Sequence, residues 1–187
     1  MFDYVMTLAA VIIGLAITHL MQGLARLLHE PGKVKIWWVH LVWVAYMLLT
    51  SVFWWWFEYV LRGVELWTFA KYLFVLSDAF ITYMIAAVLF PGGSSGFASY
   101  EDYFLARRGW FFGLQIIALA LDPIDSALKG LTHLESLGAE YWIAIIVSIV
   151  LAIIGILSAR KRVQGAIAVL FLVYQISWIA RMFATVQ

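Results

Sequence analysis

Asp78 is the residue of this chain whose position most demands a chemical explanation. It lies in the middle of an apolar stretch, where a carboxylate must be protonated, paired with a cation or solvated by water. Thr82 shares its helical face, one turn further along the chain. The spacing predicts either a proton or cation site around Asp78 or a buried hydrogen-bonding centre. The candidate partners for the carboxylate are Lys71, Arg181, His19 and His40.

A second set of polar residues lies in the first apolar stretch. Thr18, Gln22 and Arg26 are spaced four residues apart with His19 beside Thr18, so they form one stripe along a helix. A polar side chain in contact with hydrocarbon is costly, and we therefore expect the stripe to face protein. It either joins helices through hydrogen bonds or lines a polar cavity that opens to the cytoplasm.

His19 and His40 lie on neighbouring predicted helices and suggest a different chemistry. Two facing imidazoles are suited to bind haem b axially or to share a metal ion. Their predicted depths differ by about 7 Å at 1.5 Å of rise per residue. No cofactor is therefore predicted, and haem b remains an alternative.

Charged residues near the predicted helix ends form a third set. Asp122, Asp125 and Arg181 are expected on the same side of the membrane. Capping of helix ends explains both acids, and a salt-bridge network on the outer side is the alternative reading. Glu58 and Arg62 are spaced as a helical ion pair, which we expect to be interfacial and weak.

The composition defines the elements that must position these residues. The chain has 187 residues, 65% of them hydrophobic and 12% charged, whereas roughly a quarter of the residues of a soluble domain are charged. A net charge of +1 gives no basic surface for nucleic acid, and no cysteine is present to act as a nucleophile or thiolate ligand. Walker A, G-x-G-x-x-G and H-E-x-x-H motifs are absent, so the sequence indicates no class of enzyme.

Six apolar stretches are long enough to cross a membrane, at roughly 4–28, 36–60, 67–90, 102–121, 140–159 and 163–186. Asp122-Pro123 predicts a break, followed by a short amphipathic helix at roughly 123–135 in the outer interface. Ser99, three residues before Asp102, predicts the N-cap of the fourth span. The predicted fold class is all-α: a single polytopic domain, a six-transmembrane-helix bundle with a short interfacial helix between helices 4 and 5.

Basic residues predict the orientation of the bundle. Eight of the 12 lie in or beside alternate connections: Arg26, Lys33, Lys35, Arg107, Arg108, Arg160, Lys161 and Arg162. The positive-inside rule assigns these connections to the cytoplasm, which predicts both termini outside and a location in the cytoplasmic (inner) membrane.

Small residues predict close packing of the fifth span. Ser148, Ala152, Gly155 and Ala159 share one face, which is suited to contact with a helix of the same bundle or of another protomer. Because six helices in 187 residues make a thin bundle, we expect a homo-oligomer in the lipid bilayer.

The functional hypothesis is a small channel or transporter for protons or small cations. Its predicted polar core consists of Asp78, His19, Gln22, Thr18 and Thr82. One alternative is a non-catalytic membrane subunit for lipid binding or assembly. The other is a redox protein that binds haem or quinone through His19 and His40.

Overall fold

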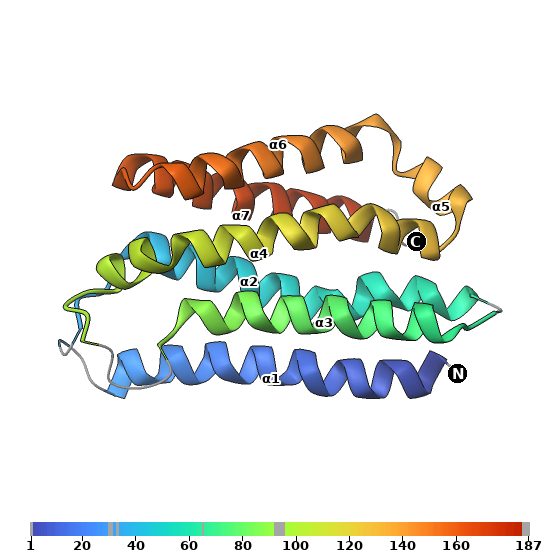
Figure 1. The fold of residues 1–187 in the computed structure, drawn as a ribbon, viewed down its shortest axis with the longest axis horizontal. Coiled ribbons are helices and arrows are strands. Elements are labelled where there is room, and N and C mark those ends of the chain that lie inside the picture. The colour runs from blue at the N-terminus through green and yellow to red at the C-terminus, as the bar shows by residue number, and fades with distance from the viewer. Residues whose placement is uncertain (1, 30–31, 33, 65, 92–95, 185–187) are drawn as a thin grey trace.

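The structure is a computed structural model that describes residues 2–29, 32, 34–64, 66–91 and 96–184, with side chains up to Arg181. Three predicted connections fall partly outside these residues, at 30–31 and Lys33, at 65 and at 92–95. The elements are α1 (Phe2–His29), α2 (Trp38–Glu58), η1 (Tyr59–Gly63), α3 (Phe69–Leu89), α4 (Tyr100–Leu128), α5 (Leu131–Ser136), α6 (Gly138–Leu157) and α7 (Lys161–Ala184) (Figure 1). All of them are helices, so the predicted all-α class is confirmed.

Six of these helices are long and apolar enough to cross a membrane, and the chain is an integral membrane protein. The boundaries of five predicted spans are confirmed closely, because their apolar runs end at polar or glycine-containing connections. The N-cap of α4 is also confirmed, since Ser99 Oγ accepts the backbone N–H of Asp102 at 3.0 Å.

The predicted break at Asp122-Pro123 is wrong. α4 continues through Pro123 to Leu128, and the short helix α5 begins only at Leu131. A proline removes one backbone hydrogen bond, a loss that membrane helices tolerate when neighbouring groups hold the next turn. The helix ends instead beside Gly130, whose φ of 129° favours glycine.

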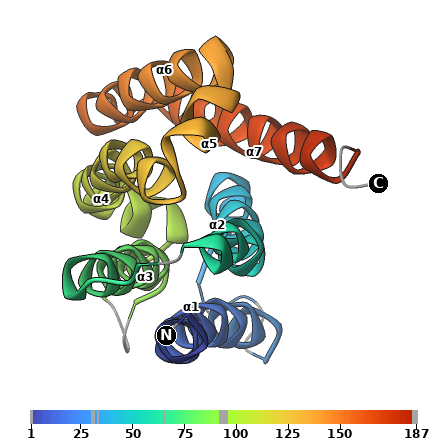
Figure 2. The same ribbon diagram turned by 90° about the vertical axis from the view of Figure 1, so that its right-hand side faces the viewer.

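The helices form an elongated bundle whose two ends differ in charge. α1 packs against α3 and α2, α3 against α4, α4 against α6, and α7 against α2 and α6 (Figure 2). We call one end the basic end, where α1 and α3 finish and α4 and α7 begin; it carries Arg26, Lys35, Arg107, Arg108, Arg160, Lys161 and Arg162. The opposite end holds the first turn of α1, η1, α5 and the last turn of α7.

The half of the bundle toward the basic end is packed with aromatic rings. Trp43 of α2 is fully buried, and its ring centroid lies 4.8 Å from that of Phe111, 5.5 Å from Phe112 and 5.3 Å from Phe171. α6 reaches this core because a Cβ on Gly155 would lie 2.5 Å from the Phe112 ring. Close packing of the fifth span within the bundle is therefore confirmed.

Candidate functional site

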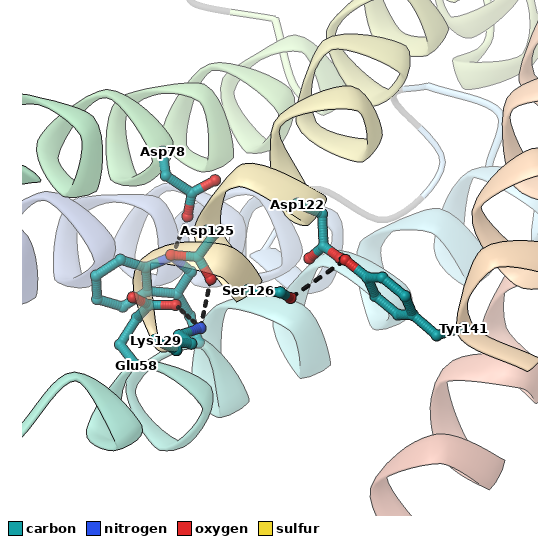
Figure 3. A network of polar contacts seen from close by, with 8 residues as sticks. Glu58, Asp78, Asp122, Asp125, Ser126, Lys129 and Tyr141 are labelled. Carbon is teal, nitrogen blue, oxygen red and sulfur yellow. Dashed lines mark hydrogen bonds and ion pairs between the residues drawn. The ribbon is translucent and has the colours of Figure 1, made fainter. Parts of the chain in front are cut away.

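Four carboxylates and one ammonium group lie together in the half of the bundle away from the basic end. Glu58 is the last residue of α2, Asp78 lies in the middle of α3, Asp122 and Asp125 lie near the end of α4, and Lys129 follows α4 directly. We call these five residues the acidic cluster (Figure 3). Three helices that are distant in sequence therefore bring their charged side chains to one place.

Lys129 is the cation of the acidic cluster. Its Nζ lies 2.7 Å from Glu58 Oε1 and also donates to Asp125 Oδ2. The side chains of Lys129 and Glu58 are only 6% and 5% exposed. Burial lowers the pKa of Lys129, but Glu58 and Asp125 raise it by more, so the net pKa lies above its ordinary value. The ammonium group is therefore charged at neutral pH and links α2 to α4.

The pair with Lys129 provides a hydrogen-bond partner for only one of the two carboxylate oxygens of Glu58. Its second oxygen, Oε2, is buried and has no hydrogen-bond partner among the described residues. A buried carboxylate oxygen without a partner is costly, which makes it a candidate for holding a proton or another ligand.

Asp78 lies at the deep side of the acidic cluster. Its Oδ2 accepts a hydrogen bond from Trp54 Nε1 at 2.7 Å, and it interacts electrostatically with Asp122, Asp125 and Lys129. The partners proposed from the sequence bind elsewhere: Lys71 Nζ donates to the carbonyl of Leu66. Arg181 forms a two-pronged pair with Glu140, at 2.7 and 2.6 Å, and therefore lies outside the cluster.

Asp122 forms the accessible edge of the acidic cluster. The Tyr141 hydroxyl of α6 donates to Asp122 Oδ2 at 2.6 Å, and Ser126 Oγ lies 3.2 Å from the same hydroxyl. Asp122 is exposed, Asp78 is half-buried, and Asp125 and Glu58 are buried. The cluster thus extends from an exposed carboxylate at its edge to a buried one beside Lys129.

Because α4 continues without a break, the charged residues near its end lie along one side of the helix. Asp122, Asp125 and Lys129 occur at helical spacings of three and four residues, so they share one face of the same helix. The sequence instead predicts a new short helix that begins at Asp122, with both acids in its first turn. The network anticipated for Asp122 and Asp125 thus exists, but Glu58 and Lys129 take the place expected for Arg181.

The polar stripe of α1 does not face the interior of this chain. Thr18, Gln22 and Arg26 are exposed, and Arg26 donates to the carbonyl of Pro91. α1 instead buries an apolar stripe: Val5, Met6, Ala9, Ile12, Ile13, Ala16, Leu20 and Gly23. Within this chain the stripe is therefore not covered by another helix, because hydrophobic packing on α3 sets the rotation of α1. A homo-oligomer that covers the stripe remains a prediction.

His19 and His40 both contact the ring of Phe90, with ring centroids at 6.4 and 4.9 Å. The Nε2 of His40 lies 2.7 Å from the carbonyl of Leu89, which can only accept, so this nitrogen carries the proton. In the described part of the chain, no three His, Asp or Glu side chains are arranged to hold a metal ion. Haem or quinone binding remains an untested alternative.

Sequence reasoning did not identify Trp54, Lys129 and Tyr141 as site residues, and it placed Glu58 at the interface. One signal was present for Glu58: it continues a buried face of α2 that also contains Ser51 and Trp54, at helical spacing. Thr82, which was predicted to belong to the polar core, is buried one turn from Asp78.

The fold and the site together define a six-helix integral membrane protein with an acidic cluster in one half, of which Glu58 and Asp125 are buried. Comparison of the chain with protein-family models, with curated proteins and with solved structures gives no match. The geometry of the acidic cluster is therefore the basis on which a function is assigned.

Proposed function

We propose that this protein is a small proton channel or transporter in which the acidic cluster takes up and releases protons. The observation that carries the proposal is the imbalance of charge: four carboxylates share one ammonium group, and Glu58 Oε2 is buried without a partner. Burying an uncompensated charge costs several kcal/mol, so carboxylates in excess of the ammonium group are expected to bind protons.

The separation of the carboxylates favours protons over a metal cation. A small cation needs several oxygen atoms that converge on one point. Asp78 and Asp122 are instead held apart by different neutral donors, Trp54 and Tyr141. Each carboxylate can therefore gain or lose its own proton while the donor keeps it in place.

The order of burial supports exchange of protons with one side of the membrane. Asp122 is exposed at the edge, whereas Asp78 lies deeper, at the tenth position of the 21-residue helix α3. The positive-inside rule supports an outer location for this side, and we propose that both termini lie there, in the cytoplasmic membrane.

The second candidate is a non-catalytic membrane subunit in which the same contacts only hold helices together. The dense aromatic packing around Trp43 favours it, because those rings separate the acidic cluster from the basic end. Proton flux through the purified protein distinguishes the two candidates.

The test is a measurement of proton flux in proteoliposomes under an imposed potassium-diffusion potential, with a pH-sensitive dye inside the vesicles. We expect the protein to change the internal pH in response to the potential and Asp78→Asn to lower the rate of that change by at least about tenfold, a typical effect of removing a proton-transfer group. Glu140→Gln is the matched control, because this exposed carboxylate at the same end lies outside the cluster.

Two results would contradict the proposal. One is a rate no higher than that of empty vesicles, which favours the structural subunit. The other is an equal loss of flux in Asp78→Asn and Glu140→Gln, which would mean that the loss does not come from the acidic cluster.

A further inference from the structure

One face of α2 connects the acidic cluster to the opposite half of the bundle. Its residues are spaced by three or four positions and are all at most 5% exposed: His40, Trp43, Met47, Ser51, Trp54 and Glu58. From His40 to Glu58 the face extends about 27 Å at 1.5 Å per residue. That length is close to the hydrocarbon thickness of a bilayer, so the face reaches from one interface toward the other.

Most polar atoms on this face are buried without a partner in the described part of the chain. They are His40 Nδ1, Trp43 Nε1, Ser51 Oγ and Glu58 Oε2, while Trp54 donates to Asp78. A fifth such atom, Gln115 Nε2, belongs to a buried residue of α4 that interacts with Tyr46 of α2. Buried polar atoms are ordinarily paired, so their alignment on one helix face requires an explanation.

Internal water is the ligand whose chemistry fits this row of unpartnered polar atoms. Water both donates and accepts hydrogen bonds, and buried water molecules ordinarily satisfy polar groups that lack protein partners. The row contains donors at Trp43 and Gln115 and acceptors at His40 and Glu58, with a hydroxyl between them at Ser51. No single organic ligand or metal ion would suit groups distributed over such a length.

We propose that this face of α2 holds a file of internal water that carries protons between Glu58 of the acidic cluster and Nδ1 of His40. The inference rests on the proposed function and extends it by naming the route. Each water molecule accepts a proton from one neighbour and releases a different proton to the next. The net result is the transfer of one proton along the file, with every water molecule left intact. Nδ1 of His40 takes the proton while Nε2–H keeps its hydrogen bond to Leu89.

Aromatic rings surround the proposed file at the level of Trp43. Around Trp43 the walls are the rings of Phe104, Phe111, Phe112 and Phe171, and Trp43 Nε1 is the unpartnered polar atom at that level. On the other side, His40 lies two residues after the first residue of α2, so a proton released from Nδ1 has a short distance to the basic end. The Trp43 indole is therefore the positioning group of the route.

The first test compares two tryptophan-to-phenylalanine substitutions in the proteoliposome assay. Trp43→Phe removes the indole N–H but keeps an aromatic ring, and Trp67→Phe makes the same change at a half-buried residue outside α2 that packs in a separate apolar cluster. We expect Trp43→Phe to slow proton flux at least about fivefold, equivalent to one lost hydrogen bond, and Trp67→Phe to leave it unchanged.

The second test detects water directly and does not depend on transport. Hydroxyl radicals generated from internal water by synchrotron radiolysis oxidise adjacent methionines. Met47 lies on the proposed file and Met6 lies in a separate apolar cluster, and each is 1% exposed. We expect oxidation of Met47 to be several times faster than that of Met6.

The two tests separate failure of the route from failure of the proposed function. Equal oxidation of Met47 and Met6, together with equal flux in Trp43→Phe and Trp67→Phe, would overturn the water file and leave proton transport standing. Fast oxidation of Met47 in a protein that moves no protons would overturn the proposed function and the role of the file in carrying protons.

Discussion

Lys129 is the residue on which the charge balance of the acidic cluster depends. It supplies the ammonium group for Glu58 and Asp125, and both ion pairs are largely buried. An ion pair of this kind adds little net stability over a well-packed apolar pair, but loss of one partner leaves a buried charge unpaired. The stability of the cluster is therefore more sensitive to removal of Lys129 than to replacement of the whole pair.

Lys129→Met is expected to lower the free energy of unfolding by about 3–5 kcal/mol, because Glu58 and Asp125 lose their counter-ion. Denaturant-induced unfolding in detergent micelles measures the effect. The lysine pKa is raised in the fold, so its contribution is complete below the ordinary lysine value of 10.5 and is lost as pH rises through the raised pKa. The difference in stability between the unmodified protein and Lys129→Met should therefore be present at pH 7 and shrink as pH rises above 10.5.

A double variant and a surface variant control this prediction. Lys129→Met combined with Glu58→Gln should recover part of the lost stability, since it removes one of the two charges that Lys129→Met leaves unpaired. Lys161→Met removes a lysine whose side chain is 68% exposed in its pair with Glu101, and it should change stability little. Equal effects of Lys129→Met and Lys161→Met would show that the buried pair is not as the structure places it.

At the scale of the helices, contacts between glycine and aromatic rings set how closely elements approach. A Cβ on Gly155 would lie 2.5 Å from Phe112, and one on Gly23 would lie 2.3 Å from Phe90. These contacts seat α6 on α4 and α1 on the end of α3. Since Tyr141 of α6 holds Asp122 of α4, the packing of this helix pair also positions part of the acidic cluster.

Gly155→Ala is expected to destabilise the protein by about 1–3 kcal/mol, the usual cost of overpacking, because the Phe112 ring is fully buried. Thermal unfolding followed by circular dichroism in detergent measures the change. Gly113→Ala on α4 is the matched control: nothing lies within 4 Å of its new Cβ, and helix propensity favours alanine. A Gly155→Ala protein as stable as Gly113→Ala would contradict the α4–α6 contact.

At the scale of the whole molecule, charge divides the bundle into two unlike ends. Arg108 donates to a carbonyl of the last turn of α6, and Lys161 pairs with Glu101 at the same end, so basic residues there also hold helices together. The acidic cluster lies toward the other end, with Asp78 at its deep side. In the proposed orientation, with the basic end in the cytoplasm, the acidic cluster lies toward the outer side of the membrane.

Labelling of single cysteines tests this orientation, and the absence of cysteine makes each variant unambiguous. Thr132→Cys in α5 should react with a membrane-impermeant maleimide added to intact spheroplasts. Ala159→Cys, between α6 and α7, should react only after the membrane is permeabilised. Both positions are exposed, so accessibility within the protein does not bias the comparison. The reverse pattern would invert the proposed topology.

Local signals were sufficient for most of the fold. Apolar runs predicted all six spans, and the hydroxyl of Ser99 predicted the start of α4, because hydropathy and capping act within one stretch of chain. The same kind of signal failed at Pro123. There, contacts with other helices hold the final turns of α4 despite the lost backbone hydrogen bond.

The sequence by itself determined that this is a six-helix membrane protein and that Asp78 is a carboxylate within a span. Only the tertiary structure decided what accompanies it: Trp54 as its donor, and Glu58 with Lys129, 71 residues apart in the chain, as the charged pair beside it. The physical reason is rotation. Which side chains of two helices meet depends on how each turns about its axis, and packing between helices sets that turn.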